Sequence, residues 1–170
     1  MTALKRALSL SLLALAGLVL WWCVAVGPLR DPEAALADFH TARNRAEDQL
    51  TDPLVLAGPG VRPLVLAAIR DPESPRRRYA IGFLGCAGYE RAASALREII
   101  ADGEEKNYYR ADALVALWQL DPTEGLHLAK VYARQSDFLG ETARRIVAGR
   151  PLIYCRSWLD AWLGRHDHGV

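Results

Sequence analysis

Residue types that carry catalysis or bind metals occur in this sequence, but their spacing fits no common reactive motif. The three cysteines, Cys23, Cys86 and Cys155, lack the C-x-x-C spacing of a metal or redox site. No G-x-S-x-G or H-E-x-x-H element is present either. His166 and His168 flank an aspartate in a polar C-terminal tail, where disorder is more common than a fixed metal site. The sequence therefore predicts no catalytic residue, no metal, no cofactor and no enzymatic activity.

A second candidate for chemistry is the stretch 71–88, DPESPRRRYAIGFLGCAG, with three arginines and three glycines. A phosphate-binding loop would need G-x-G-x-x-G after a strand, or Gly-Lys followed by Ser or Thr, and neither is present. Only Lys5 and Arg6 of the 21 basic residues precede residue 28, so 19 basic residues face 20 acidic ones in the remainder. This balance gives nucleic acid no electrostatic attraction. The stretch is better explained as part of a helical framework.

An apolar run near the N-terminus predicts a membrane anchor. Residues 7–27 contain no charge over 21 positions. As a helix they would be about 31 Å long, which matches the roughly 30 Å hydrocarbon core of a bilayer. Lys5 and Arg6 precede the run and predict a cytoplasmic N-terminus, with the C-terminal domain outside an inner (plasma) membrane.

Two alternatives to the anchor stay open. A cleaved signal peptide would use the small residues Ala25, Val26 and Gly27 as its cleavage site, although the run is longer than a usual signal sequence and Pro28 follows the cut. A buried helix of a soluble protein is the other alternative.

An internal repeat runs through the rest of the chain. The spacing of Arg77, Ala80 and Leu84 recurs at Arg110, Ala113 and Leu117. The segments in front, 63–71 and 94–102, align at a slightly shorter offset that brings Ile69 onto Ile100, and Ala143 with Val147 marks a weaker third copy. Each copy has the apolar spacing of two short helices joined by a turn.

Polar residues and glycines mark where these helices should begin and end. Ser74, Asn107 and Asp121 are expected N-caps, because Ser, Asn and Asp side chains accept the free N–H groups of a first turn. Gly88 and Gly103 follow apolar runs, where a helix often ends in a left-handed residue.

The repeat resembles HEAT repeats, in particular the short variant of phycobilisome lyases. In that pattern an apolar helix ends in Asp-Pro, and a second helix begins Arg-x-x-Ala and closes Leu-Gly-x-x-Gly. The resemblance covers about residues 60–149, and the second copy departs from it where Trp118 replaces the glycine. The matching positions are Asp71, Arg77, Ala80, Leu84, Gly85 and Gly88, with Arg110, Ala113 and Leu117 in the second copy.

The resemblance implies an α-α solenoid, so together with the apolar run the expected fold is all-α, a short α-α solenoid behind one N-terminal transmembrane helix. It also implies that Arg77 and Arg110 are structural, bonding along the ladder of turns. Stacked helices lie about 8 to 10 Å apart, so two repeats would separate Cys86 from Cys155 by on the order of 20 Å. A disulfide needs its Cα atoms within about 7 Å, so two free thiols are expected unless the C-terminus folds back.

The predicted organisation has five parts. Tyr154, Trp158, Leu159 and Trp162 have helical spacing and are expected to seal the last repeat. The parts are a cytoplasmic N-terminus (1–6), the signal anchor (7–27), a linker and capping helix (28–58), the HEAT-like repeats (59–149), and a C-terminal capping helix with a polar tail (150–170).

The expected function is that of a membrane-anchored scaffold that binds another protein, as an accessory or assembly factor of a membrane-associated complex. Exposed arginines and a tyrosine pair are the expected contacts: Arg76, Arg78, Tyr108 and Tyr109. The alternatives are a chromophore or cofactor lyase, which the resemblance suggests, and a secreted, untethered interaction domain.

Overall fold

The computed structural model describes residues 14–21 and 31–166. All regular structure in these two ranges is helical, which confirms the all-α prediction. Residues 14–21 form one helix with exposed apolar side chains. The rest of the predicted anchor, with Cys23 and the alternative cleavage site, lies outside the described residues.

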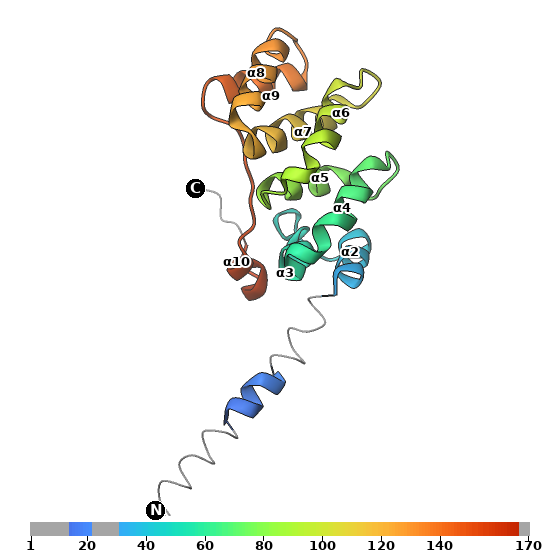
Figure 1. Ribbon diagram of the computed structural model, residues 1–170, viewed down its shortest axis with the longest axis vertical. Coiled ribbons are helices and arrows are strands. Elements are labelled where there is room, and N and C mark those ends of the chain that lie inside the picture. The colour runs from blue at the N-terminus through green and yellow to red at the C-terminus, as the bar shows by residue number, and fades with distance from the viewer. Residues whose placement is uncertain (1–13, 22–30, 167–170) are drawn as a thin grey trace, which may run out of the picture.

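Between residues 32 and 147 the helices follow one another along the long axis of the molecule (Figure 1). Short 3-10 turns at Glu47–Gln49, Gly58–Val61 and Glu90–Ala92 join some of them. The α-helices after residue 30 are α2 (Pro32–Thr41), α3 (Asp52–Ala57), α4 (Arg62–Arg70), α5 (Arg77–Cys86), α6 (Ala93–Ala101), α7 (Asn107–Leu120), α8 (Pro122–Tyr132), α9 (Phe138–Val147) and α10 (Trp158–Leu163).

Among the described residues, one helical stretch, Glu47–Arg70, is long and apolar enough to cross a membrane by length and composition alone. It includes α3 and α4, and 39% of its most apolar window is buried inside the protein. Leu54, Val61 and Ile69 of this stretch are fully buried. Since core helices pass the same test, this stretch is only weak evidence of a membrane location.

Helices adjacent in sequence pack together and share one core. Helix α4 contacts α5, α6 contacts α7, and α8 contacts α9, while α7 also contacts α5, α8 and α9. Apolar residues at the predicted helical spacing supply this core, because they put one face of each helix against its neighbour. Its largest fully buried side chains include Ile81, Leu84, Leu114, Leu117 and Leu139.

The first two repeat copies make the same arginine contact. Nε of Arg77 donates to the carbonyl of Ile69 at 2.6 Å, and Nε of Arg110 donates to the carbonyl of Ile100 at 2.9 Å. Both carbonyls belong to the last turn of the preceding helix, where the C=O groups have no N–H partner within the helix. The donors and the acceptors are the same pairs of positions that the repeat aligns in the sequence. Arg77 also donates to Glu105, in the turn of the next copy.

The third copy differs from the sequence alignment. Ala143 is fully buried as expected, but Val147 is 44% exposed and Ile146 occupies the core instead. The carbonyls that follow α8 are bonded by Arg144, whose Nη1 lies 2.9 Å from the Ala133 oxygen and 2.7 Å from the Gln135 oxygen. An arginine at a different helix position thus makes the equivalent contact.

The expected helix caps are confirmed only in part. Asp121 accepts from the N–H groups of Thr123 and Glu124 at the start of α8, and Gly88 has the left-handed φ of +61° after α5. The expectation for Ser74 was wrong, because the N-cap of α5 is Arg76, with a left-handed φ of +58°. Asn107 is the first residue of α7 rather than its cap, and Gly103 has no positive φ.

Gly85 allows α5 to approach α7 closely, which gives a test of the packing. A Cβ at residue 85 would lie 2.7 Å from the Cα and 2.9 Å from the Cβ of Ala116. We expect Gly85→Ala to lower the free energy of unfolding by about 1 to 3 kcal/mol through overpacking. Gly82 in the same helix has nothing within 4 Å of such a Cβ, so Gly82→Ala is the matched control. It should leave stability unchanged or raise it by about 1 kcal/mol. Equal effects in urea denaturation would contradict the packing argument.

Candidate functional site

The C-terminal segment does not seal the last repeat, in contrast to the sequence prediction. After α9 the chain runs back as a non-helical segment, residues 150–157, called the strap below. It ends in α10, which packs against α3 at the other end of the helix stack (Figure 1). Helix α10 therefore lies against the first helices and not against α9, and the residues expected to seal the last repeat, Tyr154, Trp158, Leu159 and Trp162, are 41% to 81% exposed.

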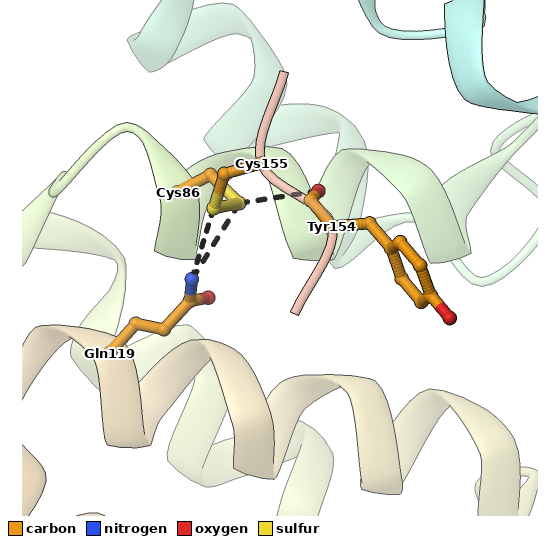
Figure 2. The surroundings of a disulfide bond; sticks show 4 residues. All are labelled: Cys86, Gln119, Tyr154 and Cys155. Atoms are coloured by element: carbon orange, nitrogen blue, oxygen red, sulfur yellow. Dashed lines mark hydrogen bonds between the residues drawn. A yellow bond between two sulfur atoms is a disulfide. The ribbon is translucent and has the colours of Figure 1, made fainter. Parts of the chain in front are cut away.

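A disulfide ties the strap to α5, so the prediction of two free thiols was wrong. Cys86 and Cys155 are bonded with their Cα atoms 5.3 Å apart (Figure 2). The larger separation expected from the sequence assumed that Cys155 stays beside the last repeat, whereas the chain folds back and brings it to the end of α5. Nε2 of Gln119 on α7 lies 3.2 Å from the sulfur of Cys155 and 3.6 Å from that of Cys86.

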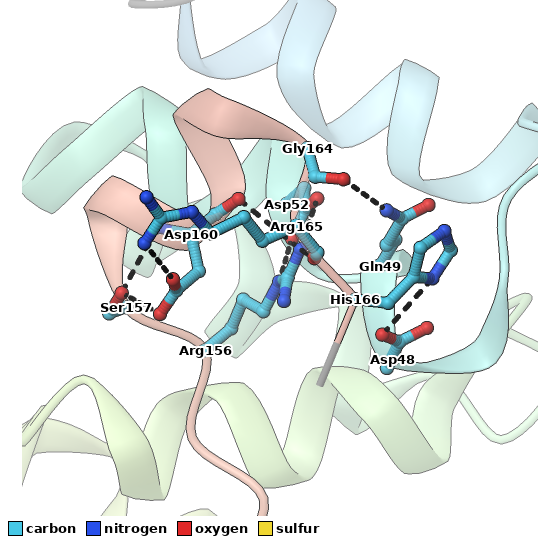
Figure 3. Close-up of polar contacts among 9 residues, drawn as sticks. All are labelled: Asp48, Gln49, Asp52, Arg156, Ser157, Asp160, Gly164, Arg165 and His166. Atoms are coloured by element: carbon cyan, nitrogen blue, oxygen red, sulfur yellow. Dashed lines mark hydrogen bonds and ion pairs between the residues drawn. The ribbon is translucent and has the colours of Figure 1, made fainter. Parts of the chain in front are cut away.

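A buried ion pair holds the end of the strap to α3 (Figure 3). Arg156 places Nε 2.6 Å from Oδ1 of Asp52 and Nη2 3.3 Å from Oδ2, and each side chain is only 4% exposed. The hydrogen bond from Arg156 to Asp52 raises the pKa of the guanidinium. Gln49 adds a bond from Nε2 to the carbonyl of Gly164, 3.0 Å long. The strap is therefore fixed near its C-terminal end by two adjacent residues, Cys155 and Arg156.

Between the strap and the helices lies a half-open pocket of about 830 Å³, called the groove below. Helix α5 contributes residues 78, 79, 82, 83 and 86 to it, and α7 contributes residues 112, 115 and 119. These spacings of three and four place the residues on one face of each helix. The apolar lining includes Leu54, Val55, Phe83, Val115, Leu152 and Ile153.

Two polar pairs join neighbouring elements across the groove. Nε of Arg78 on α5 lies 2.7 Å from Oδ2 of Asp112 on α7. Burial raises the pKa of Asp112 although Arg78 opposes the shift, and the bond to Asp112 raises the pKa of Arg78. The hydroxyl of Tyr79 donates to Glu47 at 2.7 Å, and burial followed by this bond raises the pKa of Tyr79. The groove thus combines apolar walls with a fixed set of charges.

The predicted contact residues do not form one surface. Arg78 lines the groove, whereas Arg76 donates to the carbonyls of Phe39 and Ala42 at the end of α2. Tyr108 and Tyr109 lie at the start of α7 with ring centroids 4.4 Å apart. Their role in partner binding stays a prediction.

The other repeat positions have structural contacts. Arg77, Ala80, Leu84 and Gly85 are buried in α5, and Ala113 and Leu117 are buried in α7. Arg110 is half-buried beside the ring of Tyr132. Asp71 accepts from the N–H of Glu73 in the turn after α4.

The sequence prediction missed Asp52, Arg156 and Gln119. Asp52 was visible only as part of an Asp-Pro dipeptide, and Arg156 and Gln119 carried no signal. The even number of cysteines outside the apolar run, Cys86 and Cys155, was the one available hint of the fold-back.

The protein is thus all-helical in its described part, and its own C-terminal segment covers part of one face of the helix stack. In residues 14–21 and 31–166 no three His, Cys, Asp or Glu side chains lie close enough together to hold a metal ion. Comparison of the chain with protein-family models, with curated proteins and with solved structures found no match.

Proposed function

We propose that this chain is a membrane-anchored scaffold whose groove binds an extended segment of another protein. It would act as an accessory or assembly factor of a membrane-associated complex, with the groove outside the membrane. One observation carries the proposal: the groove face already binds a non-helical peptide, the strap. The remaining lining joins apolar side chains to the Arg78–Asp112 pair, which suits a segment with both apolar and charged side chains.

The strap shows which kinds of contact this face provides to a peptide. The carbonyl oxygen of Tyr154 lies 3.5 Å from the sulfur of Cys86, and Arg156 reaches across to Asp52. The Tyr154 side chain, at 81% exposure, points away into solvent. A second segment beside the strap would meet the apolar walls and the Arg78–Asp112 pair, because the strap itself occupies Cys86 and Asp52.

A HEAT-like solenoid is the architecture that we propose for residues 59–149. The repeated contact of Arg77 and Arg110 with the end of the preceding helix supports it, as do the consecutive helix pairs. Stacked helix pairs form long rigid surfaces, which is the usual basis of protein binding by repeat proteins. Tethering would raise the effective concentration near other membrane proteins.

The membrane anchor and the compartment are part of the proposal. The apolar run at residues 7–27 supports the anchor. The disulfide supports an oxidising compartment for the domain, because disulfides persist there and are rare in the cytosol.

The groove volume favours one second candidate, a small-molecule binder such as a chromophore or cofactor lyase. Small-molecule sites usually measure about 300 to 1,000 Å³, and the groove, at about 830 Å³, lies in this range. An absorbing ligand that copurifies with the protein, in place of a protein partner, would support it.

Two matched ion pairs provide the test of groove binding. Arg78–Asp112 lies in the groove, while Arg97–Glu124 joins α6 to α8 away from it, and the arginines are 46% and 49% exposed. The carboxylates are 21% and 29% exposed, so both pairs are partly open to solvent; such pairs contribute about 0 to 1 kcal/mol, and both reversals should fold. We expect Arg78→Glu to reduce a stoichiometric copurifying protein at least tenfold in gentle detergent, and Arg97→Glu to leave it unchanged.

The double variant R78E/D112K restores an ion pair with reversed polarity and checks that lost binding is not lost folding. It should regain the stability of the wild type without regaining the partner. A partner that is retained by Arg78→Glu, or a full-length protein that always purifies alone, would contradict the scaffold proposal.

A further inference from the structure

Helix α10 has an apolar face that no described part of the chain covers. Trp158, Leu159, Trp162 and Leu163 are each 41% to 51% exposed, while Ala161 is buried. Positions 158 and 162, like 159 and 163, are four apart and so share one side of the helix. Ala161 faces the body of the protein, where α10 packs on α3. Helix α10 therefore turns a small residue towards the protein and its large apolar side chains towards solvent, which is the reverse of the usual arrangement.

The exposed face is rich in tryptophan. The rings of Trp158 and Trp162 stack with their centroids 6.0 Å apart and their planes 8° apart. Tryptophan is enriched at the boundary between lipid and water, because its ring is apolar and its N–H needs a polar partner. Arg165, which is 61% exposed at the end of the helix, can reach lipid phosphate groups.

Helix α10 lies at the same end of the helix stack as α2, the first helix after the predicted anchor. Figure 1 shows α10 beside α3, at the end of the helix stack that also carries α2, the first helix after residue 30. Nine residues, 22–30, separate Trp21, the last described residue of helix 14–21, from Asp31, the N-cap of α2. Such a segment spans at most about 35 Å, so the first helices and α10 stay close to the outer end of the anchor.

The size of the face argues against a protein as its occupant. Large aromatic side chains bury about 150 to 250 Å² each, so the two half-exposed tryptophans and the two smaller leucines together offer roughly 300 to 400 Å². A stable protein interface needs about 800 Å² per partner. A bilayer surface has no such minimum, because apolar side chains gain free energy one by one as they enter it.

We propose that α10 lies in the interfacial layer of the membrane and is a second, peripheral contact of the domain with the bilayer. The proposal rests on the proposed anchor, which brings the domain to the surface. The disulfide and the Arg156–Asp52 pair hold α10 to the body, so the contact fixes the direction in which the groove faces relative to the membrane.

The test uses the full-length protein in phosphatidylcholine vesicles whose acyl chains carry bromine near the carbonyl end, a short-range quencher of tryptophan fluorescence. The chain has five tryptophans: Trp21 and Trp22 in the predicted anchor, Trp118 in α7, and the α10 pair. The variant W158F/W162F keeps apolar rings and removes only the α10 signal. The readout is the quenched share of the total fluorescence, compared with unbrominated vesicles.

The two possibilities predict changes of opposite sign. If α10 lies in the interface, the double variant loses two quenched tryptophans and its quenched share falls. If α10 stays in water, the variant loses two unquenched tryptophans and its share rises, which would overturn the proposal. The variant W118F is the control, because loss of a tryptophan away from the bilayer should raise the share.

A separate readout distinguishes failure of the anchor from failure of this proposal. Flotation after an alkaline wash reports whether the chain stays embedded, independently of the α10 signal. The protein could be removed by the alkaline wash while W158F/W162F still lowers the quenched share of the fluorescence in neutral buffer. This result would contradict the anchor and support α10 as a surface contact. Two results would contradict the α10 proposal alone. In the first, the protein floats after the wash but W158F/W162F raises the quenched share of the fluorescence. In the second, the wild type forms a dimer in detergent and W158F/W162F does not.

Discussion

Replacing Cys86 and Cys155 by alanine is expected to lower the free energy of unfolding by about 4 kcal/mol, from the loop-closure entropy of a crosslink between residues 69 apart. The melting temperature should fall by roughly 10 to 15 °C. The disulfide joins the strap to α5, so its loss frees the chain that covers the groove. Urea denaturation followed by circular dichroism measures the change.

Reduction of the wild-type protein should reproduce the effect of the double variant. Dithiothreitol should destabilise the wild type by the same amount and leave C86A/C155A unchanged. Cys23→Ala is the matched control, because Cys23 takes no part in the disulfide, and it should keep both the stability and the response to reduction. A wild type that resists urea equally with and without reductant would contradict a stabilising crosslink.

Arg156→Ala should cost about 3 to 5 kcal/mol, because it leaves the buried carboxylate of Asp52 without its countercharge. Both side chains are 4% exposed, and the guanidinium contacts both carboxylate oxygens. Asp52 begins α3, and α10 packs on that helix, so the loss should loosen α10 as well. Thermal unfolding and hydrogen exchange of residues 158–163 measure the two effects.

Two further variants separate an unpaired buried charge from lost packing. The double variant D52L/R156M replaces the pair with apolar side chains and should recover most of the stability, since such replacements are often neutral. Arg165→Ala removes an exposed arginine 3.8 Å from Asp160 and should change stability by less than about 0.5 kcal/mol. If Arg156→Ala matched Arg165→Ala, the pair would be of no structural consequence.

The helices between residues 62 and 120 were predictable because their determinants are local. Apolar residues three and four apart define each buried face, and the predicted segments 63–71 and 94–102 correspond to α4 and α6 within one residue. The first two copies aligned because the same turn recurs with its arginine contact. The third copy was aligned one position away from Ile146, because a degraded repeat leaves too few matching residues.

The caps show where local rules end. Asp121 caps α8 as expected, since its bonds to Thr123 and Glu124 involve only neighbours. Ser74 does not cap α5, because Arg76 adopts a left-handed conformation and bonds the carbonyls at the end of α2, a helix far back in the chain. Such a long-range contact overrides a propensity that depends only on neighbouring residues.

The sequence by itself determined the helical class, the repeated helix pairs and the apolar run at residues 7–27, since each follows from composition or spacing within a short window. Only the tertiary structure decided the course of the C-terminal segment. Its direction depends on which face of the stack stays uncovered and on the carboxylate of Asp52, which lies 104 residues before Arg156 in the chain and accepts its hydrogen bond. Pairings over such distances have no sequence period, because they are selected by the burial of whole surfaces.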